Sequence, residues 1–137
     1  MITAGPQSAG GRRAEVSRGA LWFGLLGGAV AWTAHLMLAY ATAEFGCVSR
    51  LEEYAIREIS AVAWLLLLWT VVTTLVAAAA TVVAYRCYDR LRSAAAAGDS
   101  VANVELSLAR VGLLTSGLFT FVILFESLPI VFYLHHC

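Results

Sequence analysis

The chain has 137 residues and no net formal charge, and 61% of its residues are hydrophobic while only 13% are charged. Soluble domains are about 45–50% apolar and about 25% charged, so this composition excludes an ordinary soluble protein. The zero net charge also argues against a nucleic-acid partner, because binding to phosphates requires an excess of basic residues.

Three long apolar runs follow a polar tail of residues 1–18 and cover residues 20–43, 61–85 and 111–134. Each run has about 24 residues, and about 20 are enough to cross a hydrocarbon core of ~30 Å. Only a helix pairs all of its own backbone groups within such a segment. The sequence therefore predicts an all-α membrane protein, in which residues 19–137 form a single domain of three transmembrane helices.

The first apolar run has an alternative interpretation as a secretory signal peptide. Arg residues precede it, and Ala41-Thr42-Ala43 matches an A-x-A cleavage pattern. The run is longer than the apolar part of a typical signal, and the residues after Arg12-Arg13 fit a twin-Arg signal poorly. We therefore expect the first run to remain as a membrane anchor.

The distribution of basic residues predicts the orientation, because positively charged links stay in the cytoplasm. All nine basic residues are Arg, and seven of them lie before the first run or between the second and third: Arg12, Arg13, Arg18, Arg86, Arg90, Arg92 and Arg110. The link between the first two runs carries Arg50 and Arg57 against four Glu residues. We expect the N-terminus inside and the C-terminus outside.

The outer link, between the first two runs, has the pattern of a short helix. Ser49 and Glu52 are spaced as a capping box, in which each side chain satisfies a backbone donor. The apolar residues that would share one face of this helix are Leu51, Tyr54, Ala55 and Ile59. The sequence predicts a short outer helix, which either lies at the membrane interface or runs straight into the second span.

The inner link favours continuation of both neighbouring helices beyond the lipid. Residues 86–97 contain mostly helix-forming side chains, and Gly98 is a natural cap for the end of that helix. Asp99 or Ser100 can then begin the next helix. The second and third runs should therefore form a helical hairpin.

Two ionisable side chains lie within the predicted spans, His35 in the first and Glu126 in the third. His35 precedes Cys47 by twelve residues (47 − 35) and Glu126 precedes Cys137 by eleven (137 − 126). At ~1.5 Å per residue, both lie ~17 Å below the outer ends of two parallel helices. We expect an intramembrane polar pair that faces protein. Its role is either a contact between helices or subunits, which we favour, or a proton relay or a contact to a quinone or haem in a partner.

The predicted orientation places Cys47 and Cys137 on the outer side, where a bacterial periplasm is oxidising. A disulfide between them would tie the first helix to the third. The alternative is two free thiols, and Cys87 should stay reduced on the cytoplasmic side.

The C-terminal residues His135, His136 and Cys137 are possible metal ligands by residue type. Adjacent residues cannot easily face one metal ion, and structural metal sites use wider spacings. His35 lies at a different depth from the two terminal His residues, so no pair of axial haem ligands is evident. We expect no metal and no cofactor. No catalytic or nucleotide-binding motif is present, so we do not expect an enzyme.

The first run contains a G-x-x-x-G pattern formed by Gly24 and Gly28. Small residues at this spacing let another helix approach closely. The pattern predicts tight helix packing in the cytoplasmic half of the membrane.

The segment from Trp32 to Cys47 reads W-x-x-H-L-x-x-x-Y…C, in which the H is His35 and the Y is Tyr40. It resembles small three-helix membrane proteins that are associated with bacterial respiratory complexes of the haem-copper oxidase or alternative complex III type. The resemblance covers the first helix and its outer end. It implies an accessory structural subunit, without a redox centre of its own, in the bacterial cytoplasmic membrane. Its partners would be lipids and haem-containing respiratory subunits.

Two further interpretations remain open. One is an assembly factor for an oxidase. The other is a stand-alone membrane protein for proton or metal handling, which would use His35, Glu126 and the terminal His-His-Cys sequence.

Overall fold

A computed structural model of the protein describes residues 16–49, 55–56, 59–98 and 100–133. The elements are helices α1 (Arg18–Val48), α2 (Ala61–Ala96) and α3 (Ser100–Tyr133), and strands β1 (Ala55–Ile56) and β2 (Ile59–Ser60). Within the described residues, three helices are long and apolar enough to cross a membrane. The prediction of three membrane-length helices is confirmed.

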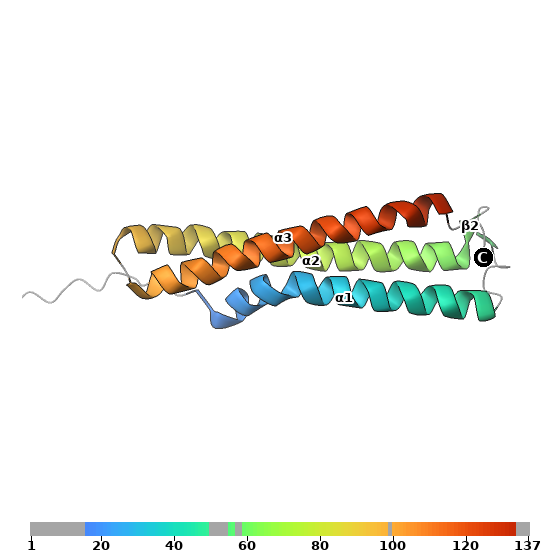
Figure 1. The fold of residues 1–137 in the computed structure, drawn as a ribbon, viewed down its shortest axis with the longest axis horizontal. Coiled ribbons are helices and arrows are strands. Elements are labelled where there is room, and N and C mark those ends of the chain that lie inside the picture. Colours follow the sequence, from blue (N-terminus) through green and yellow to red (C-terminus); the bar gives the residue numbers. More distant parts are fainter. Residues whose placement is uncertain (1–15, 50–54, 57–58, 99, 134–137) are drawn as a thin grey trace, which may run out of the picture.

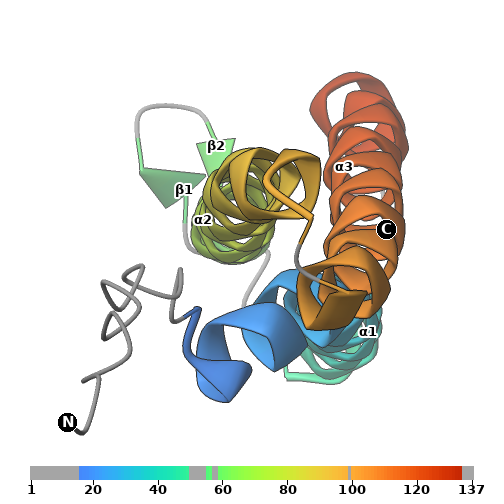
Figure 2. The same cartoon turned by 90° about the vertical axis from the view of Figure 1, so that its left-hand side faces the viewer.

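The three helices lie side by side as an elongated bundle (Figure 1). Helices α1 and α3 run in the same direction, and α2 is antiparallel to both. Each helix packs against both of the others, and the end-on view shows a triangular arrangement (Figure 2). The core is therefore a single seam enclosed by three helices.

Local sequence signals mark the ends of the helices. The Ser17 hydroxyl accepts a hydrogen bond from the Ala20 N–H at 3.2 Å and caps the start of α1. Ser60 caps α2 in the same way through the Ala63 N–H, also at 3.2 Å. Gly98 has a φ of 91°, a left-handed conformation that glycine adopts without steric cost, and it turns the chain from α2 into α3.

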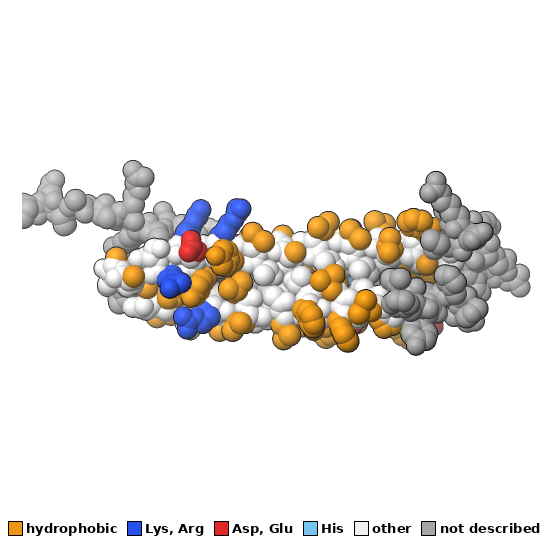
Figure 3. Space-filling model, turned by 90° about the horizontal axis from the view of Figure 1, so that it is seen from above, with side chains coloured by type: hydrophobic (Ala, Val, Ile, Leu, Met, Phe, Trp, Pro, Cys, Tyr) orange, Lys and Arg blue, Asp and Glu red, His pale blue; other side chains and the backbone are white. Residues whose placement is uncertain are grey.

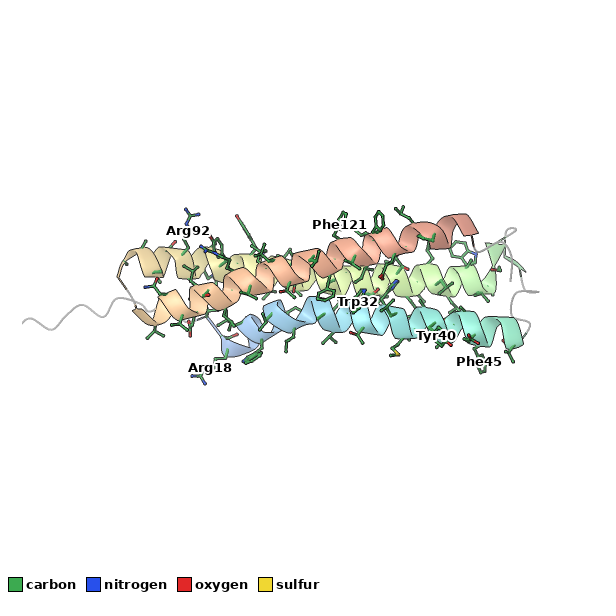
Figure 4. All side chains as sticks on the ribbon, viewed as in Figure 1. Arg18, Trp32, Tyr40, Phe45, Arg92 and Phe121 are labelled. Atoms are coloured by element: carbon green, nitrogen blue, oxygen red, sulfur yellow. The ribbon has the colours of Figure 1, made fainter. Side chains whose placement is uncertain are left out.

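The α2–α3 hairpin is longer than a bilayer requires. Helix α2 has 36 residues and α3 has 34, which correspond to about 54 and 51 Å at 1.5 Å per residue. A hydrocarbon core is ~30 Å thick. The excess lies at the end of the bundle that carries every Arg the structure describes, which we call the Arg-rich end (Figures 3 and 4). These residues are Arg18, Arg86, Arg90, Arg92 and Arg110.

Helix α2 contributes its buried side chains with the alternating three- and four-residue spacing of a helix seam. They are Val62, Leu66, Thr73, Ala77, Ala80, Ala84, Cys87 and Leu91. Small side chains occupy the middle of this seam, so the neighbouring helices approach closely there. The opposite face of α2 exposes large apolar side chains such as Leu68 and Leu75, as expected for a surface in contact with lipid.

The outer link differs from its predicted structure. Ser49 ends α1, and its hydroxyl donates to the Phe45 carbonyl at 2.5 Å. The next described residues form a two-stranded antiparallel hairpin in which Ile56 pairs with Ile59. The expected interfacial helix is therefore not present at residues 55–56 and 59–60, and residues 50–54 and 57–58 lie outside the described part. A Ser can cap either end of a helix, and here it satisfies a carbonyl of the preceding one.

Candidate functional site

The bundle encloses a group of polar side chains contributed by all three helices. We call Trp32 and His35 of α1, Thr73 of α2 and Glu126 of α3 the central polar cluster. His35 is only 2% exposed and Thr73 only 5% exposed, while Trp32 and Glu126 are half-buried. Polar groups removed from water need hydrogen-bond partners. The partners of each side chain therefore indicate whether the cluster joins the helices or binds something else.

His35 pairs with helix α2. Its Nδ1 lies 3.1 Å from the Thr73 hydroxyl oxygen, and that hydroxyl donates its hydrogen to the Trp69 carbonyl at 2.7 Å. A hydroxyl has one hydrogen to donate, and the shorter contact of this one is with the Trp69 carbonyl, so the distances favour Nδ1–H of His35 as the donor to Thr73. In that arrangement a neutral His35 ring carries its hydrogen on Nδ1, and Nε2 is its acceptor nitrogen.

Glu126 pairs with helix α1 through Trp32. The indole N–H of Trp32 donates to a Glu126 carboxyl oxygen at 3.1 Å. The Trp32 ring also packs against Phe119 of α3, with ring centroids 5.2 Å apart and an angle of 35° between the planes. Trp32 thus contacts α3 through both its polar and its apolar parts, and it points into the bundle (Figure 4).

The two ionisable residues singled out by the sequence lie close enough to interact electrostatically. Their hydrogen bonds, however, go to different residues, His35 to Thr73 and Glu126 to Trp32. The sequence signal for Trp32 is its position three residues before His35, on the same face of one helix. Thr73 lies near the middle of the second apolar run, as do Thr70 and Thr74, and the buried seam of α2 decides that Thr73 is the one that contacts His35.

Two more hydroxyl groups lie on α2 near Thr73. The side-chain oxygens of Thr70 and Thr74 are buried and have no hydrogen-bond partner among the described residues. A buried hydroxyl without a partner carries a desolvation cost of roughly 1–3 kcal/mol. These hydroxyls are the polar atoms of this region that the helix contacts leave unsatisfied.

Close backbone packing joins the helices on the Arg-rich side of the cluster. A side chain at Gly28 would place its first carbon 2.6 Å from the Ser116 Cα, and one at Gly24 would lie 3.0 Å from the Ala84 Cβ. The buried Ser116 hydroxyl donates to the Gly24 carbonyl at 2.6 Å. The two glycines singled out by the sequence therefore lie where α1 meets both α2 and α3.

A further polar contact joins α2 and α3 in this part of the bundle. The hydroxyl oxygens of Thr81 and Thr120 are 3.3 Å apart, and each hydroxyl also lies within bonding distance of a carbonyl of its own helix. Such contacts are typical of helix association in membranes, where the surrounding lipid is as apolar as the helices themselves.

The remaining predicted residues are less informative. Cys137, His135 and His136 lie outside the described residues, as does the side chain of Cys47, so the disulfide stays a prediction. Cys87 is a buried free thiol in the apolar core of the Arg-rich end. In the described part of the chain, no group of three His, Cys, Asp or Glu side chains is arranged to hold a metal ion.

The fold and the central polar cluster define a multi-pass helical membrane protein with an interior held together by contacts between helices. Comparisons with protein families, with characterised proteins and with solved structures find no match. Its function is therefore inferred from the geometry of the bundle.

Proposed function

We propose that the protein is a structural, non-catalytic subunit of a larger membrane complex. The observation that carries this proposal is the pairing of the polar interior between helices. Trp32 of α1 bonds to Glu126 of α3, His35 of α1 bonds to Thr73 of α2, and Ser116 of α3 bonds to the backbone of α1. Each of these groups contributes to holding the bundle together.

The packing beside the cluster supports a static role over proton transfer. Towards the Arg-rich end α2 contributes Ala77, Ala80 and Ala84 to the core, and they are 0–2% exposed. Ala80 and Ala84 pack against Gly27 and Gly24 of α1, and Ala77 packs with Ala31 and Ile123. Alanine and glycine have no side-chain group that can donate or accept a proton, and their close contact leaves little room for water between the helices. The hydroxyls that lie in this direction, those of Ser116, Thr81 and Thr120, each donate to a backbone carbonyl, so none of them has a free hydrogen with which to continue a relay from His35 and Glu126.

The host complex that we propose is a respiratory electron-transfer complex of the bacterial cytoplasmic membrane. This part of the proposal comes from the resemblance around Trp32, His35, Tyr40 and Cys47. Trp32 and His35 belong to the central polar cluster, whereas Tyr40 is 69% exposed and faces outward, available to lipid or a neighbouring subunit. The partners are then haem-containing subunits and membrane lipids, and the protein needs no cofactor of its own.

The proposed orientation has the Arg-rich end in the cytoplasm. The positive-inside rule supports it, because the described Arg residues gather at that end, where α1 begins and the α2–α3 hairpin turns. The opposite end, with the outer link and the C-terminus, then faces the periplasm. There the proposed Cys47–Cys137 disulfide has an oxidising environment.

A second candidate function is proton handling by a stand-alone protein. The observations that favour it are the electrostatic interaction of Glu126 with His35 and the unsatisfied hydroxyls of Thr70 and Thr74. Hydroxyls without protein partners are sites where water binds inside proteins. This candidate requires a water-filled connection between the cluster and at least one membrane surface.

Purification in a mild detergent separates the two candidates. A structural subunit is expected to elute with a much larger complex that shows haem absorbance, at a fixed ratio of protein to haem. The stand-alone candidate predicts a small particle without haem that takes up protons when reconstituted into vesicles. Elution as a small particle under conditions that keep the respiratory complexes intact contradicts the subunit proposal.

A further inference from the structure

Two arginines lie at the point where the uncharged part of α2 ends. Residues 61–85 contain no charged side chain and extend over about 37 Å at 1.5 Å per residue. A bilayer measures ~30 Å across its hydrocarbon core and about 40–45 Å with its polar headgroups. Arg86 follows this run directly, Arg90 comes one helical turn later, and both side chains are exposed. We call these two residues the α2 arginine pair, and the length of the uncharged run sets them in the headgroup layer.

Exposed aromatic side chains mark the same level of the bundle. Tyr85 directly precedes the α2 arginine pair and is 57% exposed. Gly24 of α1 lies against Ala84 of α2. These two helices are antiparallel, so Trp22 of α1 lies level with Arg86, and Trp22 is 56% exposed. Trp and Tyr are enriched where a membrane meets water, so the α2 arginine pair lies beside the lipid headgroups.

The α2 arginine pair continues an apolar row on the outward face of α2. The row consists of Leu75, Ala79 and Val82, followed by Arg86 and Arg90, and its steps of four and three residues keep it on one face of the helix. Leu75 is 64% exposed and Val82 is 49% exposed. Leu75 lies about 16 Å from Arg86 along the helix, which is close to the depth of one leaflet of hydrocarbon. The row therefore presents apolar side chains and then two guanidinium groups, in the order in which a phospholipid carries its acyl chains and its phosphate.

The guanidinium groups of the pair are available to an anion. Neither has an ion-pair partner among the described residues, and this includes the neighbouring Asp89. Arginine binds phosphate oxygens through two parallel N–H groups. The other arginines of the hairpin are placed differently, because the Arg110 guanidinium lies 5.8 Å from the centre of the Tyr88 ring. Arg92 lies six residues after Arg86, or about 240° around α2, and so it lies away from the row.

We propose that the α2 arginine pair binds the phosphate of an anionic phospholipid, whose acyl chains lie along Leu75, Ala79 and Val82. A lipid reaches the pair from within the membrane, at the depth that the uncharged run of α2 sets. The pair selects an anionic headgroup over a zwitterionic one, because a zwitterionic headgroup carries a positive group that the arginines repel. The surrounding charge acts in the same direction. In the described part of the chain, the Arg-rich end has five arginines and two acidic residues, Asp89 and Glu105 (Figure 3).

Titration of the full-length chain with defined lipids in detergent tests the site, and native mass spectrometry counts the lipids bound. The probes are phosphatidylglycerol, phosphatidylcholine with the same acyl chains, and glycerol phosphate, which is a headgroup without chains. We expect phosphatidylglycerol to bind about ten-fold or more tightly than each of the other probes. The measurement uses the isolated chain, so its outcome does not depend on the host complex. Equal affinity for the two phospholipids overturns the proposal, as does equally tight binding of glycerol phosphate.

Two matched double variants locate the site. Arg86→Gln with Arg90→Gln should weaken the binding of phosphatidylglycerol about ten-fold or more and leave that of phosphatidylcholine almost unchanged. The control, Arg92→Gln with Arg110→Gln, removes the same charge from the same end and should retain the tight binding. Thermal unfolding in detergent checks that both variants fold, and the comparison of the probes on the native chain needs neither variant. An equal loss in the two double variants also overturns the proposal, because the affinity then comes from the overall charge of this end.

Discussion

The indole N–H of Trp32 donates to the carboxyl group of Glu126 at 3.1 Å, and this bond joins the first helix to the third across 94 positions of the chain. Its neighbour on α1, His35, bonds to the middle helix. One face of α1 therefore holds both other helices through polar contacts three residues apart.

The Trp32–Glu126 bond is expected to stabilise the bundle. Trp32→Phe removes the donor and Glu126→Leu removes the acceptor, and each change should lower the free energy of unfolding by roughly 0.6–2 kcal/mol. The double variant should lose less than the sum of the single losses, because both changes remove the same bond. Unfolding titrations in mixed detergent micelles measure these differences, and strictly additive losses argue against the bond.

Glu126→Gln distinguishes a structural carboxyl group from one that must ionise. Glutamine keeps a side-chain oxygen that accepts the Trp32 N–H, but it carries no titratable proton. We expect normal assembly and normal turnover of the host complex with Glu126→Gln, and reduced assembly with Glu126→Leu. A fully assembled Glu126→Gln complex that has lost turnover supports the proton-handling candidate instead.

The Thr73 hydroxyl is expected to set the tautomer of His35. Nitrogen NMR of the histidine-labelled protein should show hydrogen on Nδ1 of the neutral His35 ring, because Thr73 uses its own hydrogen on the Trp69 carbonyl. Thr73→Val keeps the volume of the side chain and removes the acceptor. This variant should mix the two tautomers and cost roughly 1 kcal/mol of stability. An unchanged Nδ1–H signal in Thr73→Val excludes this contact as the cause.

Gly28→Ala is expected to be among the most damaging small changes in α1. The added carbon would lie 2.6 Å from the backbone of Ser116, so α1 and α3 must move apart at a cost of roughly 1–3 kcal/mol. Gly19→Ala is the matched control, because nothing lies within 4 Å of a side chain added there. Thermal unfolding should separate the two variants clearly, and equal melting temperatures would contradict the observed packing.

The orientation is testable with two added cysteines in a background without native ones. Cys87 is unsuitable as a label site because its side chain is buried. Ser93 lies exposed at the Arg-rich end and Ser49 lies exposed at the other. A membrane-impermeant maleimide should label Ser49→Cys in intact cells and reach Ser93→Cys only after lysis. The reverse pattern would place the Arg-rich end outside.

The proposed disulfide predicts a simple thiol count on the unreduced, denatured protein. The chain has three cysteines, so a Cys47–Cys137 bond leaves Cys87 as the one reactive thiol. Loss of the bond in Cys137→Ser is expected to lower stability by at most about 4–5 kcal/mol, because the closed loop contains about 90 residues. Three reactive thiols in the native protein would rule the bond out.

The sequence by itself determined the three helices and several of their ends. The length of each apolar run matches the thickness of the bilayer. This length is a property of each segment alone. Gly98 acts through the backbone beside it, so its role is also local. The pattern at Ser49 was ambiguous, because a hydroxyl can cap either end of a helix. In the structure the Ser49 hydroxyl bonds to a carbonyl at the end of α1.

Only the tertiary structure decided which polar groups meet. Counting residues along a helix gives the depth of His35 and Glu126, but their partners depend on how each helix is rotated about its axis. That rotation is set by the close contacts of Gly24 and Gly28 with the other two helices. It turns His35 towards Thr73 and brings Trp32 to Glu126, because the small residues determine where the helix backbones can touch.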